Sequence, residues 1–349
     1  MCTMKFGIIG SGSWATALAK ILTDNKNKIN WWFRSDSGIS SFKNRRHNPQ
    51  YLRSVFFNLR YLNFSTSAEE IILQSDIILI AVPSAFVVDA LSGLPKNIFT
   101  GKKVISAVKG VLPLKNVLLN EYLKSQFDVD LVNYFTVLGP CHAEEVAAEK
   151  LSYLTFSGID EQMAKKLSLR FKTPYIATLY NTDILGVQYA AILKNIYAIG
   201  AGIAHGLEYG DNFLSVLIAN SADEMAGFLR KAGIQNIEVG SLEHTTLHKK
   251  QSQRTNYAAS VYLGDLLVTC YSLYSRNRTF GNMIGKGYSV KTAQLEMNMV
   301  AEGYNASKCM YLINKKIKAE MPLAEVIYQI LWHQLPADKG FKEIEHLLI

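Results

Sequence analysis

A glycine-rich turn near the start of the chain constrains the fold more than any other feature. The run FGIIGSGSWATALA places Gly10, Gly12 and Ala15 in the pattern G-x-G-x-x-A, between an apolar run and a helical run. Gly10 permits a tight turn, Gly12 lets the backbone approach a ligand, and Ala15 lets strand and helix pack closely. In this setting the pattern predicts a strand–turn–helix unit whose helix N-terminus faces the pyrophosphate of a dinucleotide.

The rest of the chain predicts two domains of different texture. Up to about residue 182, short β-rich runs alternate with helical runs, apart from an irregular stretch at 35–63. This alternation predicts a Rossmann-like α/β domain over 1–182, with a parallel sheet and helices on both faces. Helical patterns then dominate, at 183–204, 212–231, 257–274, 289–304 and 322–332. We therefore expect a mostly α-helical domain over 183–349, and we interpret the polar stretch 241–256 as a loop.

Charge and cysteine content limit the classes of partner. The net charge is +8, but the basic residues are dispersed and are not interleaved with aromatic residues. This distribution favours small anionic ligands and argues against nucleic acid. None of the 4 cysteines forms a C-x-x-C pair, and the N-terminus lacks the layout of a signal peptide. Reduced thiols and a cytoplasmic location are therefore expected.

The run 183–206 is apolar and about long enough to span a membrane. Gln188, Lys194 and Asn195 fall in its middle. A lysine at the centre of a membrane span costs roughly 2.5 to 3.5 kcal/mol on insertion scales. We therefore expect a buried helix of a globular domain and no integral membrane span.

Several predicted strands end in residues suited to a ligand, and ligands gather at the carboxyl ends of parallel strands. Lys109 follows ISAV, while Gly139 and Cys141 lie where VLGPCHAEEV passes from strand to helix. The second strand ends in Arg34 rather than in an acidic residue that would bind the ribose hydroxyls of NAD. Arg34 could stack on adenine, meet a 2′-phosphate or remain a solvated charge, so the sequence leaves NAD and NADP open.

The helical half carries charged residues in apolar surroundings. Lys194 is the only charged residue between Ile184 and Ala204, and Asp265 lies within a second apolar run. Because a buried charge needs a partner, an ion pair between Lys194 and Asp265 is expected. Serine, arginine and asparagine residues then form a dense cluster at 275–278, and arginine forks suit phosphate recognition. The alternative is a structural Asp–Arg pair beside a solvated loop.

Taken together, these residues resemble the bacterial-type NAD(P)-dependent glycerol-3-phosphate dehydrogenase family. The resemblance extends from Gly7 to about Tyr304. It rests on GIIGSGSWATALA, SAVKG, LGPCHAEEV, LKNIYAIGAGI, GDN, LGDLLVTC, SRNR and AEGY, in that order. It implies a soluble oxidoreductase, a homodimer, that interconverts dihydroxyacetone phosphate and sn-glycerol 3-phosphate and supplies glycerol phosphate for phospholipid synthesis.

The resemblance also assigns roles to single residues. Lys194 would be the catalytic acid and base, supported by Asp265 and Lys109. The substrate would be bound by Lys109, Gly139, Cys141, Lys194, Asn195, Asp265, Ser275, Arg276 and Asn277. The cofactor would be bound by Gly10, Gly12, Ser13, Trp14, Arg34, Lys109, Ala143, Arg276 and Glu302. Cys141 stands where the family usually has serine, and the segment 233–262 looks longer than usual.

Three other interpretations stay open at this point. The chain could be a Rossmann dehydrogenase of the 3-hydroxyacyl or 6-phosphogluconate type, or a dinucleotide sensor without turnover. A metal site is disfavoured, because His244 and His248 lie in EHTTLH rather than in H-E-x-x-H and no third ligand is evident.

Overall fold

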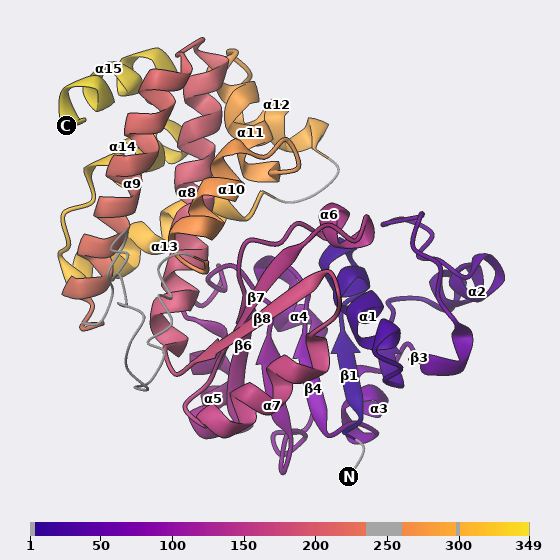
Figure 1. Cartoon of the computed structure of the whole chain (residues 1–349). Helices are drawn as coiled ribbons and strands as arrows, with labels where there is room; N and C mark the ends of the chain where they lie inside the picture. Colours follow the sequence, from indigo (N-terminus) through magenta and orange to yellow (C-terminus); the bar gives the residue numbers. More distant parts are fainter. Residues whose placement is uncertain (1–3, 235–259, 298–300, 349) are drawn as a thin grey trace, which may run out of the picture. The chain divides into compact units, whose positions relative to one another are not determined.

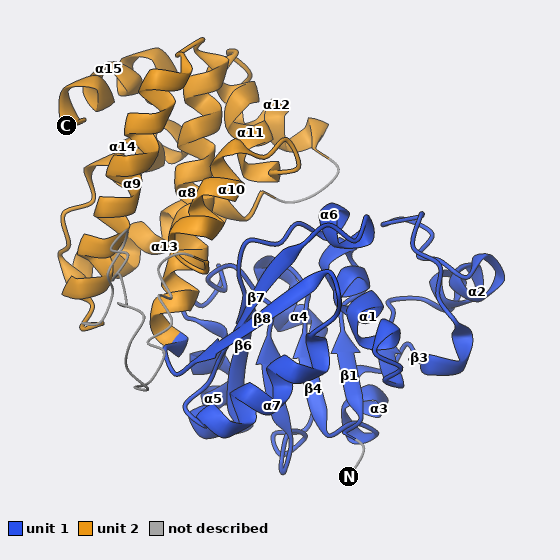
Figure 2. Ribbon diagram, viewed as in Figure 1, with its two compact units in different colours: residues 1–184 blue, residues 185–349 orange. Residues whose placement is uncertain are grey.

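The computed structural model describes residues 4–234, 260–297 and 301–348 (Figure 1). The chain divides into two compact units, Met1–Ile184 and Leu185–Ile349 (Figure 2). The sequence analysis placed its boundary after residue 182. That these units act as a cofactor domain and a catalytic domain stays a prediction. The predicted loop at 241–256 lies outside the described residues.

Unit 1 is built on an eight-stranded sheet in the order β3-β2-β1-β4-β5-β6-β7-β8. The strands are β1 (Phe6–Ile9), β2 (Ile29–Trp32), β3 (Leu62–Ser65), β4 (Ile77–Ile80), β5 (Lys103–Ser106), β6 (Tyr134–Leu138), β7 (Ser152–Ser157) and β8 (Ile176–Asn181). β1 to β6 are parallel, as predicted. β7 pairs with β6 in the antiparallel sense, and β8 runs parallel to β7.

Helices cover both faces of this sheet. One face packs under α1 (Ser13–Asp24), α2 (Asp36–Arg45), α6 (Ala143–Ala147) and α7 (Glu161–Phe171). The other packs under α3 (Ala68–Leu73), α4 (Val87–Ala90) and α5 (Leu119–Phe127). Strand residues alternate between the two cores: Phe6 and Ile8 belong to the first, and Ile9 to the second. The predicted doubly wound α/β architecture is therefore confirmed, and its central strands are apolar because both faces are covered.

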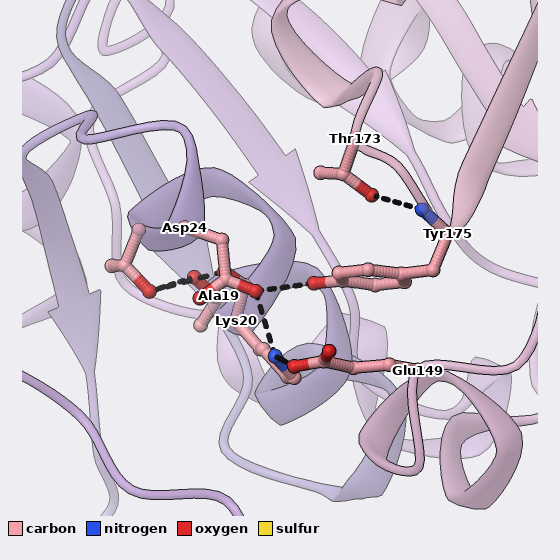
Figure 3. Close-up of polar contacts among 7 residues, drawn as sticks. Ala19, Lys20, Asp24, Glu149, Thr173 and Tyr175 are labelled. Atoms are coloured by element: carbon pink, nitrogen blue, oxygen red, sulfur yellow. Dashed lines mark hydrogen bonds and ion pairs between the residues drawn. The ribbon is translucent and has the colours of Figure 1, made fainter.

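A buried lysine on α1 lies in a polar cluster that connects three segments of unit 1 (Figure 3). Lys20 is 8% exposed, and its Nζ lies 2.7 Å from Asp24 on α1 and 2.9 Å from Glu149, just after α6. Tyr175 directly precedes β8, and its hydroxyl donates a hydrogen bond to Asp24. Desolvation lowers the pKa of Lys20, but the two carboxylates outweigh it and the net shift is upward. This cluster fixes the C-terminal half of α1 against the segment that follows α6.

Unit 2 is helical throughout its described residues. Its helices are α8 (Ile184–Gly206), α9 (Asp211–Lys231), α10 (Leu263–Tyr271), α11 (Arg276–Gly285), α12 (Val290–Glu296), α13 (Glu302–Ile317), α14 (Pro322–Trp332) and α15 (Ala337–Leu347). The predicted mostly α-helical second half is thus confirmed.

A buried glutamate joins three of these helices. Glu224 on α9 accepts backbone hydrogen bonds from Leu323 at 2.7 Å and Ala324 at 2.9 Å, at the start of α14. It also accepts the Tyr197 hydroxyl of α8 at 3.1 Å. Burial raises the pKa of the Glu224 carboxyl to about 7, although all these hydrogen bonds favour the ionised form. The carboxylate supplies the first turn of α14 with acceptors that its own N-cap, Met321, does not provide.

α8 and α11 cross at very short range because each has glycines four residues apart at the contact. A Cβ on Gly202 would lie 2.1 Å from the backbone oxygen of Arg278, and one on Gly206 would lie 2.4 Å from that of Asn282. On the other helix, a Cβ on Gly281 would lie 2.0 Å from the backbone oxygen of Ile199. Only glycine lets the two backbones approach this closely.

The structure corrects several predicted elements. Residues 35–63 are less irregular than expected, since they contain α2 and the start of β3. The predicted helix at 289–304 was wrong: α12 ends at Glu296, and a separate helix, α13, begins at Glu302. The start of the helix predicted at 257–274 lies outside the described residues, and α10 ends at Tyr271. The polar cluster after it opens a further helix, α11.

Candidate active site

The glycine-rich turn has the geometry expected for binding a dinucleotide. Gly10 adopts φ +127°, and a Cβ there would lie 2.7 Å from the backbone oxygen of Ala81 at the end of β4. Gly12 caps α1 with extended backbone, and nothing lies within 4 Å of where its Cβ would be. α1 has no side-chain cap and no acidic residue in its first turn. Its N-terminal N–H groups, at Ser13 and Trp14, therefore suit a pyrophosphate, and NAD or NADP fits the turn.

An aromatic residue on the next strand holds this turn. Trp31 is fully buried on β2, and its Nε1 donates to the backbone oxygen of Gly10 at 2.7 Å. From the sequence, Trp31 is interpreted only as filling one face of its strand. A buried indole N–H needs an acceptor, and that requirement is the signal that could have pointed to the turn.

Lys109 links the turn to the end of β6. Its Nζ lies 3.4 Å from the backbone oxygen of Gly139 and 5.4 Å from the ring centroid of Trp14. Gly139 adopts φ +140°, and a Cβ there would lie 2.5 Å from the backbone oxygen of Tyr153 on β7. Cys141 is 6% exposed, and Ala143 begins α6. The structure thus brings together four predicted residues, Lys109, Trp14, Gly139 and Gly10, at the carboxyl end of the parallel strands.

Arg34 lies just beyond β2, exposed to solvent. Its guanidinium carbon is 5.2 Å from the ring centroid of Phe86, which is 37% exposed. Asp36 does not end the strand; it begins α2, behind the N-cap Ser35. A flat cationic surface at this place suits an adenine ring or a 2′-phosphate, so both cofactors remain compatible with it.

In unit 2, Lys194 and Asp265 form the ion pair expected from the sequence. The two residues are 2% and 1% exposed, on α8 and α10. Burial raises the pKa of the nearby Cys270 thiol to about 12, and the charges of Lys194 and Arg278 offset part of that rise. A buried ammonium held by one carboxylate can exchange a proton with a ligand oxygen without long-range movement.

The start of α11 contributes the other predicted residues of this unit. Ser275 is the N-cap, and its hydroxyl accepts from the backbone N–H of Arg278. Arg276 is the first residue of α11, and Glu302 is the first residue of α13. Asn277 is 7% exposed, and its Nδ2 donates to Oδ1 of Asn195 at 2.9 Å. This last contact was not predicted, because sequence spacing does not show which helices meet.

The predicted site residues are divided between the two units. Unit 1 carries Gly10, Gly12, Ser13, Trp14, Arg34, Lys109, Gly139, Cys141 and Ala143. Unit 2 carries Lys194, Asn195, Asp265, Ser275, Arg276, Asn277 and Glu302. The roles assigned to these residues stay predictions.

Two further features concern metal binding and membrane crossing. Within the described residues no group of three or more His, Cys, Asp and Glu side chains could hold a metal ion, and His244 and His248 lie outside them. In the same residues α8 is the one helix long and apolar enough to cross a membrane. Its most apolar window is 89% buried inside the protein, as in a core helix, so it is not a clear membrane span.

Comparison with known proteins gives matches over nearly the whole chain. The N-terminal model of NAD-dependent glycerol-3-phosphate dehydrogenase matches residues 5–164, and the C-terminal model of the same family matches residues 183–342. A glycerol-3-phosphate dehydrogenase [NAD(P)+] of Bacillus anthracis is 31% identical over 330 residues, which is 94% of this chain and 92% of that protein.

Solved structures give the same result. The glycerol-3-phosphate dehydrogenase of Coxiella burnetii superimposes with a TM-score of 0.85 at 26% identity, over 98% of each chain. The fold is also shared with the glycerol-3-phosphate dehydrogenase of Plasmodium falciparum, with a TM-score of 0.81 at 21% identity, over 97% of this chain and 94% of that one. On the combined sequence and structural likeness, the chain belongs to the NAD-dependent glycerol-3-phosphate dehydrogenase family.

Proposed function

We propose that this protein is a glycerol-3-phosphate dehydrogenase that interconverts dihydroxyacetone phosphate and sn-glycerol 3-phosphate with NAD or NADP. The observation that carries the proposal is the buried pair of Lys194 and Asp265, in a chain whose two halves match the two halves of this family. The bound nicotinamide supplies or accepts the hydride. A consequence is a supply of glycerol phosphate for phospholipid synthesis.

Lys194 acts as the acid and base of the reaction. In the direction of reduction its ammonium donates a proton to the carbonyl oxygen of dihydroxyacetone phosphate, and in the other direction its amine accepts the alcohol proton. Asp265 holds the ammonium in place and compensates its charge when the site is empty. Asn195 and Lys109 orient the carbonyl end of the substrate.

The phosphate and the cofactor are held by main-chain and arginine groups. Arg276 and the N-terminus of α11, with Ser275 and Asn277, bind the substrate phosphate. Gly139 and Cys141 line the substrate on unit 1. The dinucleotide lies on Gly10, Gly12, Ser13, Trp14 and Arg34, and Lys109, Ala143, Arg276 and Glu302 complete its site.

We also propose a cytoplasmic homodimer. The three described cysteines, Cys141, Cys270 and Cys309, are buried and not joined in a disulfide, which fits a reducing compartment. Unit 2 exposes large apolar side chains after α10, with Leu273 83% and Tyr274 56% exposed, which a second copy would cover. Light scattering behind size-exclusion chromatography tests the dimer: a mass of one chain at micromolar concentration refutes it.

The activity is tested by the loss of NADH or NADPH absorbance with dihydroxyacetone phosphate. Lys194→Ala is expected to abolish turnover while leaving cofactor binding nearly intact, since Lys194 lies in the unit that lacks the glycine-rich turn. Near-normal turnover of this variant would remove Lys194 from the mechanism. If 3-hydroxyacyl or 6-phosphogluconate substrates are turned over instead, the substrate assignment fails, and no turnover with any of them supports a dinucleotide sensor.

A further inference from the structure

A chain of amide groups connects three helices of unit 2 next to Lys194. The backbone N–H of Gly303, in the first turn of α13, donates to Oδ1 of Asn277 at 2.9 Å. Nδ2 of Asn277, in the first turn of α11, donates to Oδ1 of Asn195 at 2.9 Å. Asn195 follows Lys194 on α8 and is 5% exposed. Both side-chain amides are therefore buried and engaged with each other.

The direction of these hydrogen bonds is fixed by the main chain. A backbone N–H can only donate, so the atom of Asn277 that meets Gly303 must be its oxygen. The NH₂ group of Asn277 then necessarily points to Asn195, and Asn195 must meet it with its own oxygen. Any further side-chain partner of Asn195 reached through its NH₂ group is consequently an acceptor.

Backbone packing also keeps Gly303, Asn277 and Asn195 close together. A Cβ on Gly303 would lie 2.3 Å from the backbone oxygen of Asn195 and 2.8 Å from the Ile199 side chain. The N-terminus of α13 thus rests directly on α8 at Asn195. Since a shift there would need backbone to move, the donor at Gly303 stays where Asn277 needs it.

We propose that Asn277 is a positioning residue that locks Asn195 as a hydrogen-bond donor to the substrate oxygen beside Lys194. The inference rests on the proposed function, in which that oxygen gains negative charge as hydride reaches the carbonyl carbon. A donor held in advance stabilises this charge, whereas an amide free to turn would present its oxygen to the substrate in part of the molecules. Asn277 then contributes to the chemical step, besides any contact of its remaining N–H with the phosphate.

Asn277→Asp tests the donor–acceptor direction of these hydrogen bonds without changing the size of the side chain. The ionised carboxylate still accepts from Gly303 but cannot donate to Asn195, which must turn and present its oxygen to the substrate. We expect kcat to fall about 100- to 1,000-fold, in line with the loss of one donor to a developing oxyanion, and KM for dihydroxyacetone phosphate to rise as well, because the new carboxylate repels the phosphate.

Asn314→Asp provides a matched control on the same helix as Gly303. Like Asn277, Asn314 accepts a backbone N–H with its oxygen and donates with its NH₂ group, but both of its partners are main-chain groups of Ala319, each at 2.9 Å. It lies near the C-terminal end of α13, and its variant should keep the kcat of the wild type. A fall in kcat as large as that of Asn277→Asp would mean that the loss reflects damage to α13, and would overturn the proposal.

A double-mutant cycle with Asn195→Ala separates this role from phosphate binding. If Asn277 acts through Asn195, Asn277→Asp has little further effect on kcat once Asn195 is alanine. Effects that multiply in the double variant, or a rise in KM with kcat intact, would show that Asn277 acts through the phosphate alone, and would refute the inference.

Thermal melting of the same four proteins gives a second readout that needs no substrate. The shift in Tm of the double variant should be smaller than the sum of the single shifts, because both changes break one hydrogen bond. Additive shifts contradict the amide chain. If the wild type fails to turn over dihydroxyacetone phosphate, the proposed function fails, while this cycle still decides whether Asn277 holds Asn195.

Discussion

The crossing of α8 and α11 predicts a loss of stability from the smallest possible addition, one methyl group. In Gly281→Ala the new Cβ would lie 2.0 Å from the backbone oxygen of Ile199, where ordinary contact begins near 3.4 Å. The helices must therefore separate locally by roughly 1.4 Å, which a close-packed interior resists. Overpacking of this kind costs about 3 kcal/mol, and the better helix propensity of alanine returns about 1 kcal/mol.

The expected net loss is about 2 kcal/mol, which for a unit of this size lowers Tm by about 4 to 8 °C. Gly227→Ala is the matched control, because Gly227 is also inside a helix, α9, but nothing lies within 4 Å of its would-be Cβ. There only the propensity changes, and Tm should rise by a few degrees. Circular dichroism at 222 nm during heating measures both shifts.

The double variant Gly202→Ala with Gly281→Ala sharpens the test. Once the first alanine has pushed the helices apart, the second meets more room. The loss of stability in the double variant should therefore be smaller than the sum of the losses in the two single variants. The separation would also move the start of α11 away from Lys194 and Asn195, and turnover should fall with Tm. A Gly281→Ala protein that melts at or above the wild-type temperature would refute the reasoning.

Two further predictions concern buried charges. The pKa of Glu224 is near 7 in the folded protein against 4.5 in the unfolded chain, so the folded protein binds more protons between these values and its stability falls as pH rises through this window. Through this window Glu224 changes the free energy of unfolding by about 3 kcal/mol. Urea unfolding at pH 5 and pH 8 should show that Glu224→Gln has lost this pH dependence. An unchanged pH dependence in the variant contradicts the prediction. Lys20→Met removes the cation shared by Asp24 and Glu149, whose side chains are 39% and 61% exposed, and should cost about 1 kcal/mol at pH 7 because solvent screens both pairs; a stability equal to the wild type would contradict this.

The sequence predicted those parts of the fold that have a local or periodic signature. The apolar strands of the parallel sheet and the glycine-rich turn are recognisable because their residue types follow directly from burial and from local backbone conformation. The reversal at β7 was not predictable in this way. α6 has only five residues, with a rise of about 7.5 Å, and the chain runs back along the sheet as β7 itself, antiparallel to β6.

The candidate site was predicted unevenly for a similar reason. An isolated lysine and an isolated aspartate in apolar runs point to each other because a buried charge demands a partner. The contact between Asn277 and Asn195 carries no such demand in the sequence, since a neutral amide is satisfied by many partners. It depends on which helices meet, and close approach of the helices is decided by glycines at the contacts rather than by the polar residues themselves.

The hydrogen bond from Trp31 to Gly10 has a consequence for changing the cofactor preference of this enzyme. Two residues near the end of β2, three positions apart, have different roles in the proposed cofactor site: Trp31 donates to Gly10 in the turn proposed for the pyrophosphate, and Arg34, beside Phe86, is proposed for the adenosine side. An exchange of the whole strand end for that of an NAD-selective or NADP-selective dehydrogenase would alter both. If the proposed cofactor site is right, exchanging Arg34 alone while Trp31 is retained should change the preference between NAD and NADP and leave the hydrogen bond that holds the turn intact.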